Sequence, residues 1–345
     1  SAGAGPPLDA AGPGDPALLP YTSGTTGTPK GALLSHGNLL ASAEAVRLAW
    51  RWTADDRLVL CLPLFHVHGL GVGVHGTLLA GASAVLHERF DPEAVLAEAA
   101  GGEATLLFGV PTVYARLVEA PGADRLQGLR LCVSGSAPLS AELHGRIRAR
   151  AGQVVLERYG MTETVMLVSN PYDGERRPGT VGLPLPGVEV RLDDRSGEIE
   201  VRGPNVFGGY WRRPDADAAA FTGDGWFRTG DVGALDPDGY LRIVGRAKEL
   251  IITGGFNVYP REVEDVLRAH PDVADAAVVG TPSAEWGETV TAYVEAGEGL
   301  DAEGLLAWAA GQLAPYKRPR RVHRVDALPR NPLGKVLRHR LRPPG

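Results

Sequence analysis

The chain has 345 residues and a formal net charge of −6, with 44% hydrophobic and 22% charged residues. This length suggests two domains, and the composition is that of a globular protein that buries a large core. The sequence has no apolar run of about 18 residues and no signal-peptide pattern, so we expect no membrane contact, and the acidic balance argues against nucleic-acid binding.

The amino-terminal residues 1–18 are rich in Pro, Gly and Ala, and we expect them to form a flexible lead-in. The chain begins with Ser1 and its first Met is Met161, so we expect a fragment or a processed form of a longer protein. The two cysteines, Cys61 and Cys132, are too few for a disulfide framework, which favours a cytoplasmic location.

A loop rich in Gly, Ser and Thr, YTSGTTGTPKG, spans residues 21–31. It follows a short apolar segment and precedes a helical pattern, so we expect a strand-to-helix turn. Small residues let backbone N–H groups surround phosphate oxygens, and Lys30 adds charge. The loop is not a Walker A loop, because Pro29 precedes the lysine and Gly31 follows it. We interpret it as a phosphate loop of another kind; an ordinary Gly/Thr turn is the alternative.

Apolar runs separated by loops or helical patterns follow this loop and predict a mainly parallel α/β sheet. Alternation around a turn predicts a β-hairpin at 188–202, and short strands continue through 224–246. The buried strands are expected at 57–64, 104–110, 129–135 and 153–160.

The last hundred residues form a separate pattern: a helix, two strands, a second helix and a basic tail. We place the helices at 260–270 and 305–314 and the strands at 274–280 and 290–296. A domain boundary at 245–248 then divides the chain. The predicted fold class is α/β, with a large layered domain at 19–245 that includes a β-rich part, followed by a small α+β domain at 246–345.

Six sequence segments occur in a fixed order across nearly the whole chain. They are YTSGTTGTPKG (21–31), SGSAPLS (134–140), ERYGMTET (157–164), GWFRTGD (225–231), VGRAKELIITGGFNVYPREVE (244–264) and PRNPLGK (329–335). Together they resemble the motifs of the ANL superfamily of adenylate-forming enzymes, which includes acyl-CoA synthetases, peptide-synthetase adenylation domains and luciferases.

This resemblance implies both a fold and a reaction. The fold would be a large αβαβα-type domain, here without the family's amino-terminal subdomain, followed by a small lid domain. The reaction would join a carboxylate to ATP as an acyl-adenylate, with release of pyrophosphate, and then pass the acyl group to coenzyme A. The resemblance implies Mg²⁺, ATP and coenzyme A as cofactors, small molecules as partners, and a monomer or weak dimer.

The resemblance also assigns nucleotide-binding residues. Glu163 would help to coordinate Mg²⁺, which prefers oxygen ligands. Asp231 would accept the ribose hydroxyls with its two oxygens, and Arg246 would contact the ribose or a phosphate. The complete predicted set comprises Glu163 together with Thr22, Ser23, Gly24, Thr25, Thr26, Gly27, Lys30, Gly135, Ser136, Ala137, Glu157, Tyr159, Gly160, Met161, Thr162, Asp231 and Arg246.

Lysine is rare in this chain, which has only four lysines among its 35 basic residues. Lys335 matches the family's catalytic lysine. In that role, a compact ammonium would stabilise the carboxylate and the α-phosphate together. Lys248 matches the hinge about which the small domain swings, after which Gly254 and Gly255 would line a tunnel for the CoA thiol. Lys317 has no clear counterpart. The surrounding basic run suggests a solvated lid rim or a site for CoA phosphates rather than nucleic acid.

The acid substrate is indicated by the segments LPLFHVHG (62–69), ERYGMTET and SNPYDGER (169–176), which resemble those of malonyl-CoA synthetases. Arg158 would bind the second carboxylate of malonate or methylmalonate, because a buried arginine needs a partner. An internal salt bridge to Glu157 or Glu163 is the alternative. His66 and its neighbour His68 would help to position a carboxylate or would be structural.

Three other functions remain open at this point. They are a synthetase for another short-chain acid, an adenylation domain that loads a carrier protein, and an inactive nucleotide-binding fragment.

Overall fold

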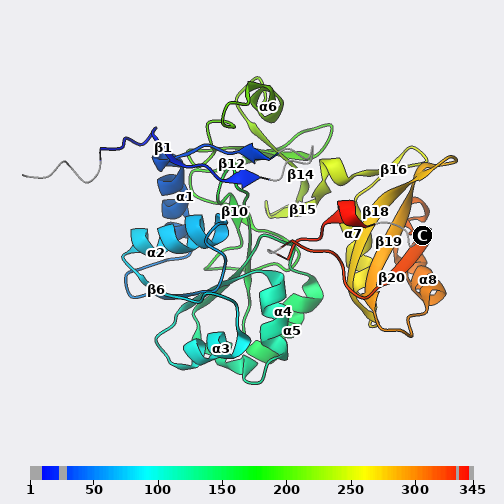
Figure 1. The fold of residues 1–345 in the computed structure, drawn as a ribbon, viewed down its shortest axis with the longest axis horizontal. Helices are drawn as coiled ribbons and strands as arrows, with labels where there is room; N and C mark the ends of the chain where they lie inside the picture. The colour runs from blue at the N-terminus through cyan, green and yellow to red at the C-terminus, as the bar shows by residue number, and fades with distance from the viewer. Residues whose placement is uncertain (1–9, 23–28, 332–333, 342–345) are drawn as a thin grey trace, which may run out of the picture.

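The computed structural model describes residues 10–22, 29–331 and 334–341, and Figure 1 shows their arrangement. Its largest sheet has seven strands in the order β11-β10-β9-β8-β7-β5-β6. Strands β9, β8, β7, β5 and β6 run parallel, whereas β10 pairs antiparallel with both of its neighbours, β9 and β11. All four predicted buried strands are confirmed here. The strands are β5 (Arg57–Leu60), β6 (Ser83–Leu86), β7 (Leu106–Gly109), β8 (Leu131–Ser134), β9 (Leu156–Tyr159), β10 (Val168–Ser169) and β11 (Leu183–Pro184).

The helices around this sheet form two groups in different regions of Figure 1. The first group comprises α1 (His36–Ala49), η1 (His68–Val74) and α2 (His75–Ala80). The second comprises α3 (Pro92–Ala100), α4 (Pro111–Glu119), η2 (Ala123–Gly128) and α5 (Ala141–Ala151). Strands β7 and β8 are buried along their whole length, so their sequences are continuous apolar runs.

The loop at 21–31 joins two strands rather than a strand and a helix. Tyr21 pairs with Gly31 and Thr22 pairs with Lys30, so the loop connects an antiparallel hairpin. Helix α1 begins only at His36, where Ser35 forms a capping box with Asn38. The predicted strand-to-helix turn is therefore wrong. The short strands in this region are β1 (Pro16–Leu18), which takes the last three residues of the predicted lead-in, β2 (Tyr21–Thr22), β3 (Lys30–Gly31) and β4 (Leu34–Ser35).

A β-rich part follows the large sheet, and it confirms the hairpin predicted at 188–202. Four antiparallel strands lie in the order β12-β13-β14-β15. They are β12 (Glu189–Leu192), β13 (Glu198–Arg202), β14 (Phe227–Leu235) and β15 (Leu241–Arg246), with α6 (Pro214–Ala220) between the second and third strands.

The carboxy-terminal part forms a five-stranded sheet with both predicted helices. One strand, β20, lies within the predicted basic tail and pairs in parallel with β19, so the tail is not simply irregular. The elements are η3 (Ala247–Glu249), β16 (Ile251–Thr253), β17 (Phe256–Val258), α7 (Pro260–Arg268), β18 (Val273–Ser283), β19 (Gly287–Ala296), α8 (Ala302–Gln312), η4 (Pro315–Lys317), β20 (Arg321–Val325) and η5 (Arg338–Arg340).

Two large hydrophobic cores underlie this architecture. The larger core extends from the α/β sheet into the β-rich part, and the other is confined to the carboxy-terminal sheet and its helices. The predicted α/β class is thus confirmed, whereas the exact boundary at 245–248 stays a prediction. In the described ranges, no helix is both long and apolar enough to cross a bilayer.

Candidate active site

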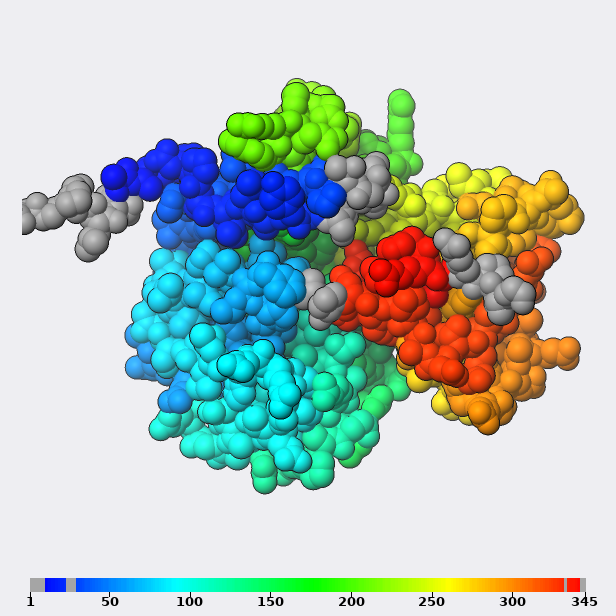
Figure 2. Space-filling model, viewed as in Figure 1, coloured from blue at the N-terminus to red at the C-terminus, as the bar shows by residue number. Residues whose placement is uncertain are grey.

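A cavity of about 800 Å³ lies at one edge of the large sheet. Because β7, β8 and β9 are parallel neighbours, the residues that follow them meet at this edge. Thr112, Ser136 and Gly160 reach the cavity in this way. The carboxy-terminal segment (red) lies at the junction between the large part and the small part of the molecule (Figure 2). The predicted site residues that line the cavity are Ser136, Ala137, Glu157, Arg158, Tyr159, Gly160, Met161, Asp231, Arg246 and Lys335.

The loop after β8 is held in an uncommon backbone conformation. Ser136 has a φ of 68°, which non-glycine residues rarely adopt and which is found most often at functional sites. A Cβ atom at the adjacent Gly135 would overlap the guanidinium of Arg158, so a larger residue there would displace that side chain. Ser136 Oγ lies 3.2 Å from His68 Nδ1. The loop thus brings the predicted adenine and acid residues into direct contact.

Arg158 is buried in β9 without an ionic partner among the described residues. It is only 5% exposed, and its Nε and Nη2 atoms have no hydrogen-bond partner in that part of the chain. Burial lowers the pKa of the guanidinium to about 9. The alternative internal salt bridge does not form: Glu157 Oε1 accepts from the Leu139 N–H, and Glu163 Oε1 accepts from Tyr210.

Two histidines share the surroundings of Arg158. Burial, with a smaller contribution from the Arg158 charge, lowers the pKa of His66 to about 4 and lowers that of His68 well below its usual value. Both rings are therefore neutral at pH 7. The Nδ1 atom of His66 accepts from the His68 backbone N–H, and His68 Nε2 is buried without a partner among the described residues.

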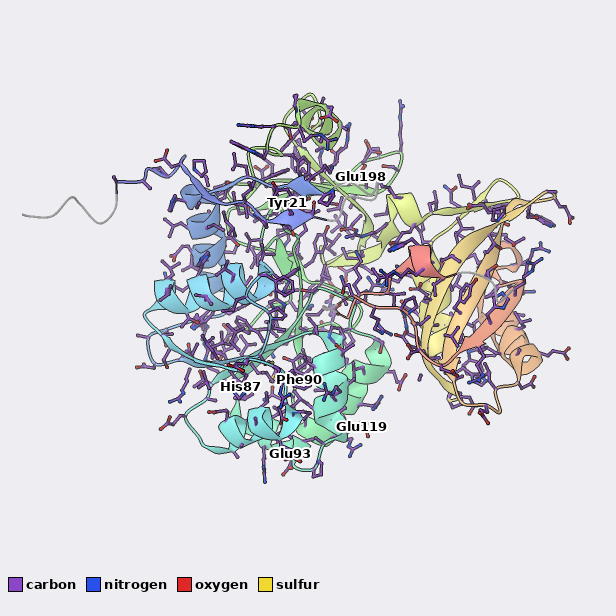
Figure 3. All side chains as sticks on the ribbon, in the orientation of Figure 1. Tyr21, His87, Phe90, Glu93, Glu119 and Glu198 are labelled. Carbon is purple, nitrogen blue, oxygen red and sulfur yellow. The ribbon has the colours of Figure 1, made fainter. Side chains whose placement is uncertain are left out.

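Asp231 is the centre of a hydrogen-bonded group at the cavity. Tyr159 Oη donates to Asp231 Oδ2 at 2.6 Å, and Arg246 Nε lies 3.0 Å from Oδ1. Strand pairing explains the second contact, because Asp231 in β14 lies opposite Arg246 in β15. Glu198 in β13, labelled in Figure 3, accepts from the N–H of Gly230 and so supports the turn before Asp231.

Glu163 is buried outside the lining of the cavity and is linked to the phosphate loop through a tyrosine. Tyr210 Oη donates to Glu163 Oε1 at 2.9 Å, and Lys30 Nζ lies 4.1 Å from the centre of the Tyr210 ring. Burial raises the pKa of Glu163. The backbone of Tyr210 pairs with Ala32, directly after the phosphate loop. Tyr210 was not predicted, because no local pattern marks it.

Lys335 reaches the same cavity from the far end of the sequence. It lies in a tight loop that is closed by a bridge between Arg330 and Val336. Desolvation, with a smaller contribution from the nearby Arg246 charge, lowers the pKa of Lys335. A Cβ atom at Gly334 would lie 3.2 Å from Thr112 Oγ1, so this loop contacts the start of α4.

Several predicted site residues lie apart from this cavity. Lys248 is exposed in η3, and Gly254 and Gly255 form the turn between β16 and β17. Lys317, left unassigned by the sequence, pairs with Glu262 at 2.6 Å. Thr162 and Gly135 do not line the cavity themselves, but each is next in sequence to a residue that does. The Thr22 hydroxyl donates to the Lys30 carbonyl. The predicted phosphate-loop residues Ser23, Gly24, Thr25, Thr26 and Gly27 lie outside the described residues.

Comparison with known proteins identifies the family. The sequence profile described as "AMP-binding enzyme" matches residues 2–211, and "AMP-binding enzyme C-terminal domain" matches residues 262–335. A feruloyl-CoA synthase from an Amycolatopsis species is 42% identical over 98% of this chain and 71% of its own length. A sulfoacetate–CoA ligase from Cupriavidus necator is 43% identical over 97% and 68%. The mitochondrial malonate–CoA ligase ACSF3 of Mus musculus is 40% identical over 94% and 64%. The chain therefore belongs to the AMP-binding enzyme family and is an acyl-CoA ligase.

Solved structures of malonyl-CoA synthetases have the same fold. ATP-bound MatB from Rhodopseudomonas palustris superimposes with a TM-score of 0.92 at 48% identity, over 95% of this chain and 68% of that chain. A malonyl-CoA ligase in a ternary product complex with methylmalonyl-CoA and AMP superimposes with a TM-score of 0.68 at 50% identity, over 94% and 74%. Sequence divergence does not account for the lower TM-score, because the second protein is the more identical of the two.

Proposed function

We propose that this acyl-CoA ligase activates malonate, with methylmalonate as a second substrate, and produces malonyl-CoA, AMP and pyrophosphate. The observation that carries the proposal is the buried Arg158, whose Nε and Nη2 have no partner among the described residues. A buried, unpaired charge is unfavourable, so an anion that enters this pocket is bound strongly. The planar fork of a guanidinium matches the two oxygens of a carboxylate.

The need for a second anionic group separates the candidate acids. Malonate and sulfoacetate each carry one carboxylate to be activated and a second anionic group for Arg158. Acetate and unbranched fatty acids lack that group, so the arginine would remain unpaired in their complexes. The neutral rings of His66 and His68 add polar atoms without adding charge beside Arg158. Malonate is favoured because malonate ligases occur both among the sequence relatives and among the similar structures.

In the first half-reaction, a carboxylate oxygen of malonate attacks the α-phosphorus of ATP. The bond from this phosphorus to the oxygen that bridges to the β-phosphate breaks, and pyrophosphate leaves with the electron pair. Lys335 stabilises the charge on the attacking oxygen and the α-phosphate. Asp231 accepts hydrogen bonds from the ribose, and Tyr159 forms one wall of the adenine site. Correct positioning of the two reactants supplies much of the rate increase.

Glu163 is the residue that would hold Mg²⁺. Tyr210 donates to its Oε1 atom, and Mg²⁺ in nucleotide sites is typically held by one or two carboxylates together with phosphates and water, so a single carboxylate fits this role. When bound, the ion would supply positive charge to the phosphate oxygens. The raised pKa of Glu163 is consistent with a carboxylate that gains from a nearby cation.

In the second half-reaction, the CoA thiol attacks the acyl carbon and AMP leaves. We propose that rotation at Lys248 withdraws Lys335 and brings Gly254 and Gly255 to the cavity as part of the thiol tunnel. Two observations support the assignment of the two half-reactions to two positions of the small domain. The glycine turn lies outside the cavity that Lys335 lines. The TM-score is 0.92 to the ATP-bound relative and 0.68 to the product complex, as expected if the small domain changes position between the two states.

The substrate is tested by measuring pyrophosphate release with ATP and one of five acids: acetate, octanoate, malonate, methylmalonate or sulfoacetate. We expect malonate to give the highest kcat/KM, about 100-fold or more above acetate, because a charged hydrogen-bonded pair is lost with acetate. A clear preference for sulfoacetate would show that sulfoacetate, and not malonate, is the substrate of this ligase. A preference for acetate or octanoate, or no release with any acid, would contradict the proposal.

A further inference from the structure

Two glycines lie at close contacts between the large domain and the small domain. In each contact the two partners belong to opposite sides of the proposed hinge at Lys248. Gly334 of the small domain faces Thr112 at the start of α4, where a Cβ atom would lie 3.2 Å from Thr112 Oγ1. Gly245 of β15 faces Tyr259, which directly precedes α7. A Cβ atom at Gly245 would lie 3.0 Å from Cδ1 of the Tyr259 ring and 3.2 Å from Tyr259 Cβ, closer than such atoms normally pack.

Gly245 is held on the nucleotide side of the cavity. It pairs with Val232 in the β-rich part, its neighbour Arg246 pairs with Asp231, and Gly245 itself lines the cavity. Its φ lies outside the left-handed region, so its backbone conformation is open to other residues, and β-branched residues suit a strand. What Gly245 faces, rather than its backbone, is therefore the reason that a side chain is unfavourable there.

Tyr259 is held on the side of the small domain. Its neighbours Val258 and Pro260 are both buried, and Val258 pairs with Ile251 of β16. Tyr259 is also the N-cap residue of α7, and its carbonyl accepts from the Glu262 N–H in the first turn of that helix. The Cβ atom of Tyr259 therefore moves only if the start of α7 moves, and rotation of the ring alone does not relieve an overlap with this atom.

Rotation at Lys248 would break the contact between Gly245 and Tyr259, because one residue precedes the hinge and the other follows it. In the described structure α7 packs beside β15, and Lys335 lines the same cavity as Gly245. The close contact thus belongs to the arrangement in which the catalytic lysine is at the nucleotide site.

We propose that Gly245 is a positioning residue for adenylation: because it has no side chain, Tyr259 packs directly against β15 and the small domain comes close enough for Lys335 to reach the nucleotide site. The inference rests on the proposed function and its two half-reactions. A side chain at position 245 pushes Tyr259 and α7 outward, and Lys335 moves away from Arg246 with them. Thioester formation, which the mechanism assigns to the rotated position, does not need this contact.

The first test measures the two half-reactions separately in Gly245→Ala and Gly245→Val, with an acid that the unmodified protein activates. Pyrophosphate release reports adenylation, and thioester formation is followed from supplied acyl-adenylate. We expect valine to slow adenylation about tenfold or more and alanine to slow it less, with thioester formation within about twofold of the unmodified rate. Equal loss of both half-reactions, or no loss of adenylation with valine, would overturn the proposal.

The matched control for these variants is Gly128→Val. A Cβ atom at Gly128 would lie 3.2 Å from the Ala99 carbonyl oxygen, but both residues belong to the large domain and neither lines the cavity. This variant should leave the ratio of the two half-reaction rates within about twofold of the unmodified ratio, even if it lowers stability. A change in this ratio as large as that in Gly245→Val would contradict a role specific to the contact across the hinge.

A double-mutant cycle tests whether Gly245→Val acts through Tyr259. Tyr259→Gly removes both the ring and the Cβ atom and keeps a residue that is accepted at an N-cap. In the Tyr259→Gly background, Gly245→Val should change the rate of adenylation by less than about twofold, because the atoms that it overlaps are gone. A tenfold loss that persists in this background would overturn the proposal.

A further readout does not depend on the acid substrate. A Cβ atom at Gly334 would lie 4.0 Å from Thr112 Cβ, within the range for a disulfide, and the native Cys61 and Cys132 are buried. The rate of disulfide closure in a Thr112→Cys/Gly334→Cys protein therefore reports how often the loop of the catalytic lysine occupies the cavity. Gly245→Val should slow closure about fivefold or more. Unchanged closure would contradict the proposal even if malonate proves not to be the substrate.

Discussion

Tyr210 joins two groups that handle the triphosphate in the proposed reaction, since its hydroxyl donates to Glu163 and its ring lies beneath Lys30. Tyr210→Phe keeps the ring and removes the donor. Loss of a hydrogen bond to a buried carboxylate costs about 1–3 kcal/mol and raises the pKa of Glu163 further. We expect the KM for Mg-ATP to rise roughly tenfold with a smaller change in kcat. Calorimetric titration with Mg-ATP checks the same change without turnover.

The matched control for this substitution is Tyr240→Phe. The Tyr240 hydroxyl donates to the Glu175 carbonyl at 2.9 Å, and its ring is covered by Arg177, but it touches neither Glu163 nor Lys30. This variant should bind Mg-ATP as the unmodified protein does. Equal weakening in both variants would show that Tyr210 acts only through general stability.

At the residue scale, the sequence predicts which charged residues and glycines belong to the site. It does not predict the residues elsewhere in the chain that hydrogen-bond to them. Arg158 could be predicted because a buried arginine demands a partner, and the structure leaves it unpaired among the described residues. Tyr210 could not be predicted, because its hydroxyl meets a carboxylate 47 positions away along the chain.

At the element scale, the turn between β16 and β17 offers a clean comparison of two glycines. Gly254 and Gly255 have φ values of 56° and 81°, so a side chain is strained at either position. At Gly254 a Cβ atom would also lie 2.8 Å from the Trp286 ring, whereas nothing lies within 4 Å of one at Gly255. Gly254→Ala should therefore reduce the free energy of unfolding by about 1 kcal/mol more than Gly255→Ala, as measured by chemical denaturation.

The same pair of variants tests the proposed tunnel. Adenylation should stay within about twofold of the unmodified rate in both, because the turn lies outside the cavity. Thioester formation should fall in Gly254→Ala as the turn shifts away from Trp286. If adenylation falls as much as thioester formation, the turn has no separate role in the second half-reaction.

The strands of the large sheet that are buried on both faces were predictable, whereas the connection made by the phosphate loop and the strand β20 were not. Strands β5, β7, β8 and β9 appear in the sequence as apolar runs because both faces of the sheet are covered. The phosphate loop was predicted to connect a strand to a helix, but it connects strands β2 and β3. Gly and Thr indicate a turn and do not show whether a strand or a helix follows it. Strand β20 was missed because the segment Arg321–Val325 carries two arginines and a histidine, and its pairing with β19 is distant in sequence.

At the scale of the whole molecule, the proposed mechanism makes the position of the small domain decide which half-reaction the cavity can support. The described structure has Lys335 beside Arg246 and Asp231, which is the arrangement that the proposed adenylation step requires. Sequence could suggest a hinge at Lys248 but could not specify this arrangement. Two positions of a domain on a short connection can differ by only a few kcal/mol, and bound ligands shift that balance.

The central claim is that Arg158 holds the second carboxylate of malonate, and Arg158→Ala tests it most directly. The measurement is malonate-dependent pyrophosphate release, with ATP binding and thermal stability measured on the same protein as controls. We expect kcat/KM for malonate to fall about 100-fold or more while ATP binding is retained, because the substitution removes a charged, two-point hydrogen bond and leaves the nucleotide contacts in place. Unchanged kcat/KM for malonate in the folded variant would contradict the account.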